Sequence, residues 1–293
     1  MNRSKKWLLY LIVLMVSAAF CLYHLFPADA VGQYLVSELN RAVPAVRVTA
    51  DTVKLKPVFP LGLKLEGVGV NYLGKAAFYA ETMVVRPDLL SLLSHTVNVS
   101  FAGAAAKGVF KGMARVPRAK GDGLLSVDVD LDRIRIEDIP AVYEFIRQDV
   151  AGSLNGQVTF TRANVGGTAN GRAHLVLSDC TIQLQTPLIP LNSVAFNSIE
   201  TDITIEAERL EIKRCDLRGN QLDADFTGSV VMMKPAGKSV LNLRGSMKPH
   251  PLLLAGIRIM FPVDSLSENR SGGEIPVRVR GTLDSPGVSF PRQ

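Results

Sequence analysis

The sequence contains few aromatic residues, few cysteines and no large excess of charge of one sign. Aromatic residues make up 6% of the 293 positions, and there are only 3 Cys and 1 Trp. So few cysteines exclude a disulfide scaffold, and 24 Gly with 16 Pro are too few for collagen. A hydrophobic content of 47% excludes a wholly disordered chain. One or two globular domains are therefore expected.

The positive charge is concentrated at the amino terminus. The formal net charge is +6, but Arg3, Lys5 and Lys6 supply three positive charges before any acidic residue occurs. Along the rest of the chain the two signs are mixed. A nucleic-acid site usually shows as clustered Lys and Arg, often with aromatic residues between them. We therefore expect no nucleic-acid partner.

One segment is long and apolar enough to cross a bilayer. Residues 7–26 carry no formal charge, and a helix of that length spans a hydrocarbon core of about 30 Å. The basic residues precede it and Asp29 follows it, so the positive-inside rule places the amino terminus in the cytoplasm. We therefore expect a single-pass anchor with the bulk of the chain exported from the cytoplasm. A competing interpretation is a cleaved secretory signal, for which 28–30 (Ala-Asp-Ala) offers a site.

A short amphipathic helix is expected after this anchor. Val31, Leu35 and Leu39 recur every four residues between Pro27 and Pro44. The predicted organisation is therefore a cytoplasmic tip and transmembrane anchor over 1–26, a connecting helix over 27–44, and a β-rich periplasmic domain over 45–293.

From residue 45 onward the hydrophobic period changes from 3.6 to 2. Alternation recurs in more than ten short segments separated by turn residues, which is typical of antiparallel strands joined by hairpins. We predict a mainly β fold, in which one curved antiparallel sheet forms a gutter or flattened barrel with a few short helices. The apolar face is either an open groove or an ordinary closed core. The residues predicted to line it are Leu125, Val127, Val129, Leu131, Ile203, Ile205, Leu222 and Phe226.

Two segments change phase, and others interrupt the alternation. A slip of one residue would turn the apolar side outward, so a bulge or tight turn is predicted at Asp132/Arg133 and at Glu208/Arg209. Short helices are predicted over 87–94, 139–150 and 250–260, and a loop over 265–273. Residues 107–123 fit either a strand or a loop.

No motif for catalysis or metal binding is present. Asp128, Asp130 and Asp132 form D-x-D-x-D, but the sixth position of a calcium loop is not Gly, and strand alternation places all three on a solvated face. The histidines are isolated, and there is no G-x-S-x-G or phosphate-binding glycine motif. We expect no enzymatic activity, catalytic residue, metal or cofactor. Cys180 and Cys215 either form a disulfide or remain buried thiols.

Several segments resemble a known family. Residues 136–140 (Ile-Glu-Asp-Ile-Pro), then a short helix and 151–156 (Ala-Gly-Ser-Leu-Asn-Gly), are similar to an internal segment of AsmA-like proteins and of type II secretion system protein N. Residues 273–290, with Gly-Thr-Leu before a proline and a final strand, are similar to the close of those families. The length of the chain makes the secretion protein the nearer match.

The resemblance implies a function without chemistry. It indicates a non-enzymatic, inner-membrane-anchored periplasmic component of type II secretion, acting by protein–protein interaction or scaffolding with other secretion-system proteins. The alternative is an AsmA-like lipid-binding or lipid-transfer protein of the cell envelope, with phospholipid as its ligand. The resemblance supplies no site residues.

Overall fold

One antiparallel sheet makes up most of the computed structural model. The structure describes residues 37, 40, 46–56, 62–72, 74–88, 90–91, 94–117, 124–142, 149–163, 167–188, 191–251 and 274–290. The strands are β1 (Val46–Thr49), β2 (Thr52–Lys56), β3 (Gly62–Tyr72), β4 (Lys75–Pro87), β5 (Thr96–Ala105), β6 (Gly108–Pro117), β7 (Leu124–Arg135), β8 (Val150–Ala163), β9 (Ala169–Leu188), β10 (Leu191–Glu206), β11 (Arg209–Gly219), β12 (Leu222–Val231), β13 (Val240–Pro249), β14 (Ile275–Thr282) and β15 (Pro286–Ser289).

Nearly every strand pairs with its neighbours in sequence. From β3 to β15 the order in the sheet is the order in the chain, and β1 and β2 both pair with β3. All pairings are antiparallel, as expected for strands joined by short connections. The predicted mainly β fold with a curved antiparallel sheet is confirmed.

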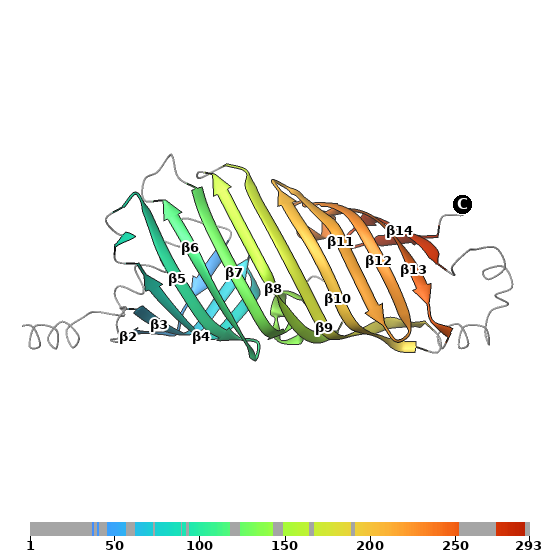
Figure 1. Ribbon diagram of the computed structural model, residues 1–293, viewed down its shortest axis with the longest axis horizontal. Helices are drawn as coiled ribbons and strands as arrows, with labels where there is room; N and C mark the ends of the chain where they lie inside the picture. The colour runs from blue at the N-terminus through green and yellow to red at the C-terminus, as the bar shows by residue number, and fades with distance from the viewer. Residues whose placement is uncertain are drawn as a thin grey trace, which may run out of the picture.

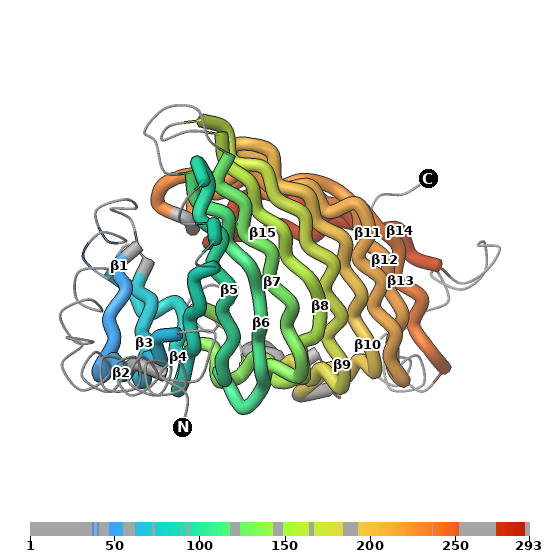
Figure 2. Tube along the Cα trace, turned by 60° about the vertical axis from the view of Figure 1, so that its left-hand side comes forward, coloured from blue at the N-terminus to red at the C-terminus, as the bar shows by residue number. Residues whose placement is uncertain are grey.

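The sheet is curved, with one concave and one convex face. In Figure 1 the strands from β5 to β13 form a broad tilted layer, and β3 and β4 at one end and β14 at the other lie behind it. Figure 2 shows the same layer from the side, with β15 visible behind β7. The sheet therefore bends toward its far side in Figure 1, and that side is the concave face.

Tight turns join the central hairpins. Ala106 and Lys107 both have positive φ, 47° and 59°, between the paired residues Ala105 and Gly108. Positive φ at both central positions defines the hairpin turn whose twist matches that of the strands. Residues 107–123, which the sequence left between strand and loop, contain β6.

A bulge in β7 and a hairpin turn between β10 and β11 account for the two predicted phase changes. In β7 the register shifts between Leu131 and Ile134, and Arg133 has a φ of 53°, so the predicted bulge is confirmed. The second phase change is a hairpin turn in which Glu206 pairs with Arg209. The turn therefore lies at residues 207–208, one position before the predicted site. Both devices return apolar side chains to the same face.

Two hydrophobic clusters lie against the sheet, one at its amino-terminal end and one at its middle strands. The first joins Val68, Ala80 and Phe110, with partly buried Leu131 against them. Because these residues come from strands β3 to β7, this cluster forms where the sheet curls over at its amino-terminal end. The second cluster joins Ile136, Val150, Cys180 and Phe196.

The predicted helices are shorter than expected or lie outside the described residues. Residues 140–142 are helical, but Val150, predicted as the end of a helix, begins β8. Pro87 ends β4, and hydrogen bonds from Ser91 N–H to Asp88 O and from Ser94 N–H to Ser91 O form turns after it. Two short 3-10 turns cover Ile136–Asp138 and Ala236–Lys238. The predicted segments 252–260 and 265–273 lie outside the described residues.

The predicted anchor over residues 7–26 also lies outside the described residues. Of the predicted connecting helix only Ser37 and Asn40 are described, and both are helical. The Asn40 amide donates to Val48 O at 3.1 Å and accepts from Val48 N–H at 2.7 Å, so it pairs with β1 as a neighbouring strand would. Within the described ranges, no helix is long and apolar enough to span a bilayer.

Candidate functional site: the concave apolar face

A continuous apolar row crosses the sheet from β3 to β15. Residues directly opposite each other on paired antiparallel strands point to the same face, so the register traces one line across the sheet. Every position on this line is apolar or glycine. The line consists of Leu63, Val85, Phe101, Gly112, Val129, Val158, Ala173, Ile203, Ile212, Gly228, Leu243, Val279 and Val288.

The side chains of this row are not enclosed. All of them are half-buried except Val288, which is 59% exposed. Of the fourteen buried hydrophobic residues among those described, eight belong to the two clusters and none lies in the row. The concave face is therefore a continuous, partly solvent-accessible aliphatic surface.

The predicted lining residues all lie on this face. Leu125, Val127, Val129 and Leu131 alternate along β7 with carboxylates that point to the other side. Each of the eight predicted residues is half-buried and none is buried. The remaining four share the face through the pairings Ala173–Ile203, Gly171–Ile205, Cys215–Phe226 and Leu222–Pro249.

Phenylalanine rings lie over glycines on this face. Phe101 is opposite Gly112, and Phe110 is opposite Gly103. A Cβ at Gly112 would lie 2.5 Å from Phe101 Cζ, and a Cβ at Gly103 would lie 2.7 Å from Phe110 Cζ. Each ring therefore occupies the space of a missing side chain on the next strand. This arrangement lays the rings along the sheet and keeps the surface shallow.

One charged residue interrupts the apolar face. Arg162 near the end of β8 is opposite Leu125 on β7 and Ala169 on β9, both on the concave side. Sequence reasoning missed this residue. The alternation could have predicted its position, because Arg162 is two residues beyond Phe160 and four beyond Val158, and every second residue of a strand points to the same face.

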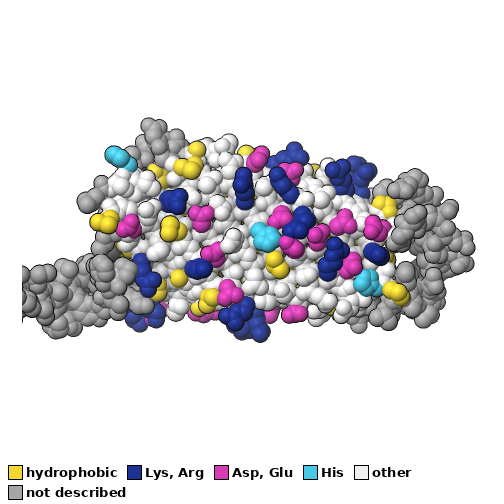
Figure 3. All heavy atoms as spheres, in the orientation of Figure 1, with side chains coloured by type: hydrophobic (Ala, Val, Ile, Leu, Met, Phe, Trp, Pro, Cys, Tyr) yellow, Lys and Arg dark blue, Asp and Glu magenta, His cyan; other side chains and the backbone are white. Residues whose placement is uncertain are grey.

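The convex face, in contrast, is charged. Figure 3 shows Lys, Arg, Asp and Glu side chains of both signs scattered over it, with separate hydrophobic groups between them. As predicted from the alternation, Asp128 and Asp130 lie on this face, and Asp130 is 3.7 Å from Lys111 Nζ. Within the described part of the chain, no group of three or more His, Cys, Asp and Glu side chains could hold a metal ion.

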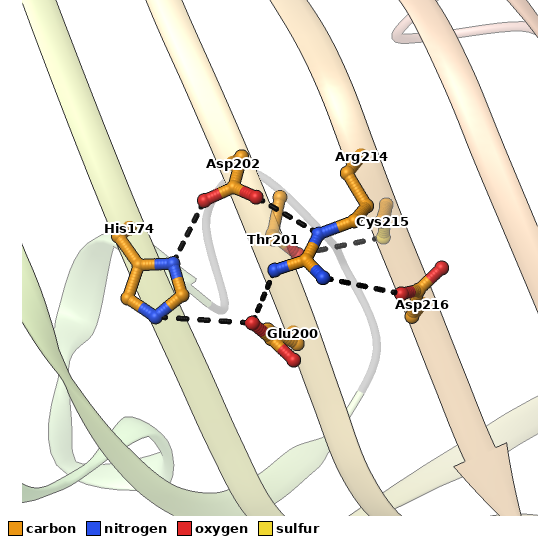
Figure 4. A network of polar contacts seen from close by, with 7 residues as sticks. All are labelled: His174, Glu200, Thr201, Asp202, Arg214, Cys215 and Asp216. Carbon is orange, nitrogen blue, oxygen red and sulfur yellow. Dashed lines mark hydrogen bonds and ion pairs between the residues drawn. The ribbon is translucent and has the colours of Figure 1, made fainter.

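An ion-pair network on β9, β10 and β11 is the most connected polar feature of the convex face (Figure 4). His174 Nδ1 lies 2.7 Å from Asp202 Oδ1, and Arg214 Nε donates to Asp202 Oδ2 at 2.9 Å. Arg214 also pairs with Glu200 and lies 3.8 Å from Asp216. The hydrogen bond from His174, aided by Arg214, lowers the pKa of Asp202 below its ordinary value. The side chains of this network are at least partly exposed and form ion pairs with one another. The network therefore links the three strands, and each of its charged groups has a partner.

Cys180 and Cys215 lie on different strands. Cys180 on β9 is buried and Cys215 on β11 is partly buried, and both are free thiols. The strand β10 lies between them, and Cys180 pairs with Phe196 whereas Cys215 pairs with Thr201, five residues further along β10. Two strand spacings alone separate their backbones by about 9–10 Å, beyond the reach of about 7 Å that a disulfide allows. Burial raises the pKa of both thiols. Neither is therefore an activated nucleophile.

In comparisons with known proteins, the chain matches no family model, and neither a curated protein nor a solved structure shows significant similarity to it.

Proposed function

We propose that the protein binds acyl lipids on its concave face and acts without catalysing a reaction. The observation that carries this proposal is the in-register row of half-buried aliphatic side chains from β3 to β15. A solvent-accessible apolar surface of this extent is unfavourable in water, and each methylene group that covers it contributes about 0.8 kcal/mol.

The chemistry of the face favours an acyl chain over a peptide. The backbone N–H and C=O groups of the inner strands are paired within the sheet, so the face offers few hydrogen-bonding groups to an occupant. A peptide laid on it would leave its own backbone groups unsatisfied, whereas a hydrocarbon chain has none. A mainly aliphatic surface also tolerates chains of different length and saturation.

The proposal includes the location predicted from the amino terminus. A membrane anchor over 7–26 would hold the sheet on the periplasmic side of the inner membrane, beside a supply of phospholipid. A fusion of a periplasm-dependent reporter enzyme to the carboxyl terminus tests this orientation. We expect this reporter to be active. If it is inactive, and a reporter that works only in the cytoplasm is active at the same position, the orientation is wrong.

Lipid binding is tested by photo-crosslinking in cells that express the full chain. Cells take up a fatty acid with a diazirine in its acyl chain, and after irradiation the lipid-modified peptides are mapped by mass spectrometry. Modification is expected in peptides of β7 to β10. Crosslinks confined to the amino-terminal segment, or none at all, would overturn the proposal.

A matched pair of variants separates the two faces of the sheet. Val158→Lys with Ile203→Lys puts two charges on the concave face, while Thr159→Lys with Thr204→Lys puts them on the adjacent convex positions of the same strands. Crosslinking to β7–β10 is expected to fall in the first variant only. Circular dichroism shows whether each variant folds. If the lysine variant of the concave face does not fold, Val158→Thr with Ile203→Thr is used in its place.

A second candidate, a component of type II secretion, is favoured by the free edge of the sheet. In the described chain β15 pairs only with β14, and beside its open edge Val288 and Phe290 are 59% and 58% exposed. An exposed edge strand is a template for pairing with another protein. Co-purification of secretion components, lost on Val288→Lys, would support this role. Unchanged export of secreted proteins after deletion of the gene would contradict it.

A further inference from the structure

Arg162 is exceptional in its position. Across the described strands from β5 to β15 the register places every Asp, every Glu and every other Arg or Lys on the convex face or in a turn, and only Arg162 on the concave face. Its neighbours there, Leu125 and Ala169, carry no polar group.

Among the described residues, Arg162 Nε has no hydrogen-bond partner. This atom is buried, and no described carboxylate lies within ion-pair distance. On the convex face, by comparison, Arg214 contacts three carboxylates. A buried guanidinium donor without an acceptor is costly, and no described residue supplies an acceptor to Arg162 Nε.

The position of Arg162 fits the end of a lipid. It is four residues beyond Val158 of the apolar row, about 13 Å along the strand, and one residue before β8 ends. Arg162 therefore lies near one end of the strand, where the residues opposite it on both flanking strands are aliphatic. The planar donors of arginine match the oxygens of a phosphate group.

We infer that Arg162 binds the headgroup phosphate of a phospholipid whose acyl chains lie on the concave face. The inference rests on the proposed lipid-binding function and narrows its ligand from any acyl lipid to a phosphate-bearing one. The phosphate supplies the acceptor that Arg162 Nε lacks, and the charge fixes which end of the lipid lies near this end of β8. Neutral lipids such as diacylglycerol use only the apolar part of the site.

The test compares two lipids with identical acyl chains on the full-length protein. Phosphatidic acid and diacylglycerol, each carrying the same diazirine, are titrated against detergent-solubilised protein, and crosslinking to peptides of β7–β10 is quantified by mass spectrometry. The variants are Arg162→Leu, the conservative Arg162→Lys, and as a control Arg115→Leu, an exposed arginine on the convex face of β6.

The expected result is a preference of the wild type for phosphatidic acid. Arg162→Leu should weaken phosphatidic acid binding about tenfold and leave diacylglycerol unchanged, while Arg162→Lys retains part of the preference. Equal binding of both lipids by the wild type, or an equal loss in Arg115→Leu, overturns the role of Arg162 and leaves lipid binding standing. Failure of the wild type to crosslink either lipid overturns both proposals.

Discussion

Phe101 on β5 lies directly across Gly112 on β6, and its ring fills the space of the side chain that Gly112 lacks. The same relationship joins Phe226 and Gly245 on β12 and β13, where an added Cβ would lie 2.8 Å from the Phe226 ring. Large side chains on the concave face are thus accommodated within the sheet rather than above it. The rings of Phe101 and Phe226 therefore lie along the sheet, as the proposed binding of a long apolar ligand requires.

Gly112→Ala should destabilise the fold. The new Cβ would lie 2.4 Å from Asp128 O as well as against Phe101, so the backbone of β7 or the ring must move. Overpacking of this kind costs about 1–3 kcal/mol. The free energy of unfolding, measured by urea titration with circular dichroism, should fall by that amount.

Gly171→Ala is the matched control for that substitution. It lies on the same face of β9, and its added Cβ would meet Ile205 Cβ at 3.4 Å, an ordinary contact. Because alanine loses less conformational entropy than glycine, stability should stay the same or rise by up to about 1 kcal/mol. Equal losses in the two variants would show that the ring-over-glycine packing is not the cause.

Glu66 should titrate far below an ordinary glutamate. Hydrogen bonds from Lys64 at 2.7 Å and Lys54 at 3.0 Å lower its pKa from 4.5 to about 2. Because the folded-state pKa is depressed, the stabilisation by these ion pairs is present above pH 4.5 and is lost as the pH falls toward 2.

The Glu66 prediction is checked by NMR titration of its side-chain carboxyl carbon. In Lys54→Met with Lys64→Met the pKa should return toward 4.5. A low pKa that persists in the double variant would contradict the assigned cause. Stability between pH 2 and 4.5 should also become less pH-dependent in that variant than in the wild type.

His174→Ala should raise the pKa of Asp202. The hydrogen bond from His174 is the largest cause of the depression, with Arg214 contributing after it. Since the pKa is depressed in the folded state, the contribution of Asp202 to stability is lost as the pH falls below its ordinary range. NMR titration of Asp202 measures the shift directly, and no change on substitution would contradict the network as drawn.

His250→Ala provides the reciprocal control. Burial acts to raise the pKa of Asp223, but hydrogen bonds from His250 at 3.0 Å and from Gly219 N–H outweigh it and lower the pKa. His250→Ala should therefore raise the pKa of Asp223 and leave Asp202 unchanged. If either histidine substitution shifts both aspartates, the two sites are coupled through the sheet.

Cys180 and Cys215 should react slowly and separately. Both thiols are at least partly buried with raised pKa values, so alkylation by iodoacetamide at neutral pH should be slow in the folded protein and fast in denaturant. Peptide mass spectrometry without reductant should find each modified once. A peptide pair bridged by a Cys180–Cys215 disulfide would contradict the strand order between them.

The local pattern of the chain was sufficient to predict the sheet. Alternation of period 2 at Leu125, Val127 and Val129 is a strong signal because every second side chain must share a face. The same alternation predicted the bulge at Arg133. The turn at 207–208 was predicted one residue too late, because a hairpin turn and a bulge both return the apolar residues to the same face and the pattern does not distinguish them. Helix ends were the weakest prediction, since Val150 fits a helix terminus and a strand start equally well.

What the sequence alone determined, then, is the class of the fold, the face on which each strand carries its apolar residues, and the absence of a recognisable catalytic motif. Tertiary structure decided three things: that the strands pair in chain order, that the apolar face stays partly exposed along one row, and that Arg162 is the one charged residue which the described strands from β5 to β15 place on that face. The physical reason is that alternation is a property of each strand. Exposure and isolation depend on which strands become neighbours and on how far the sheet curls.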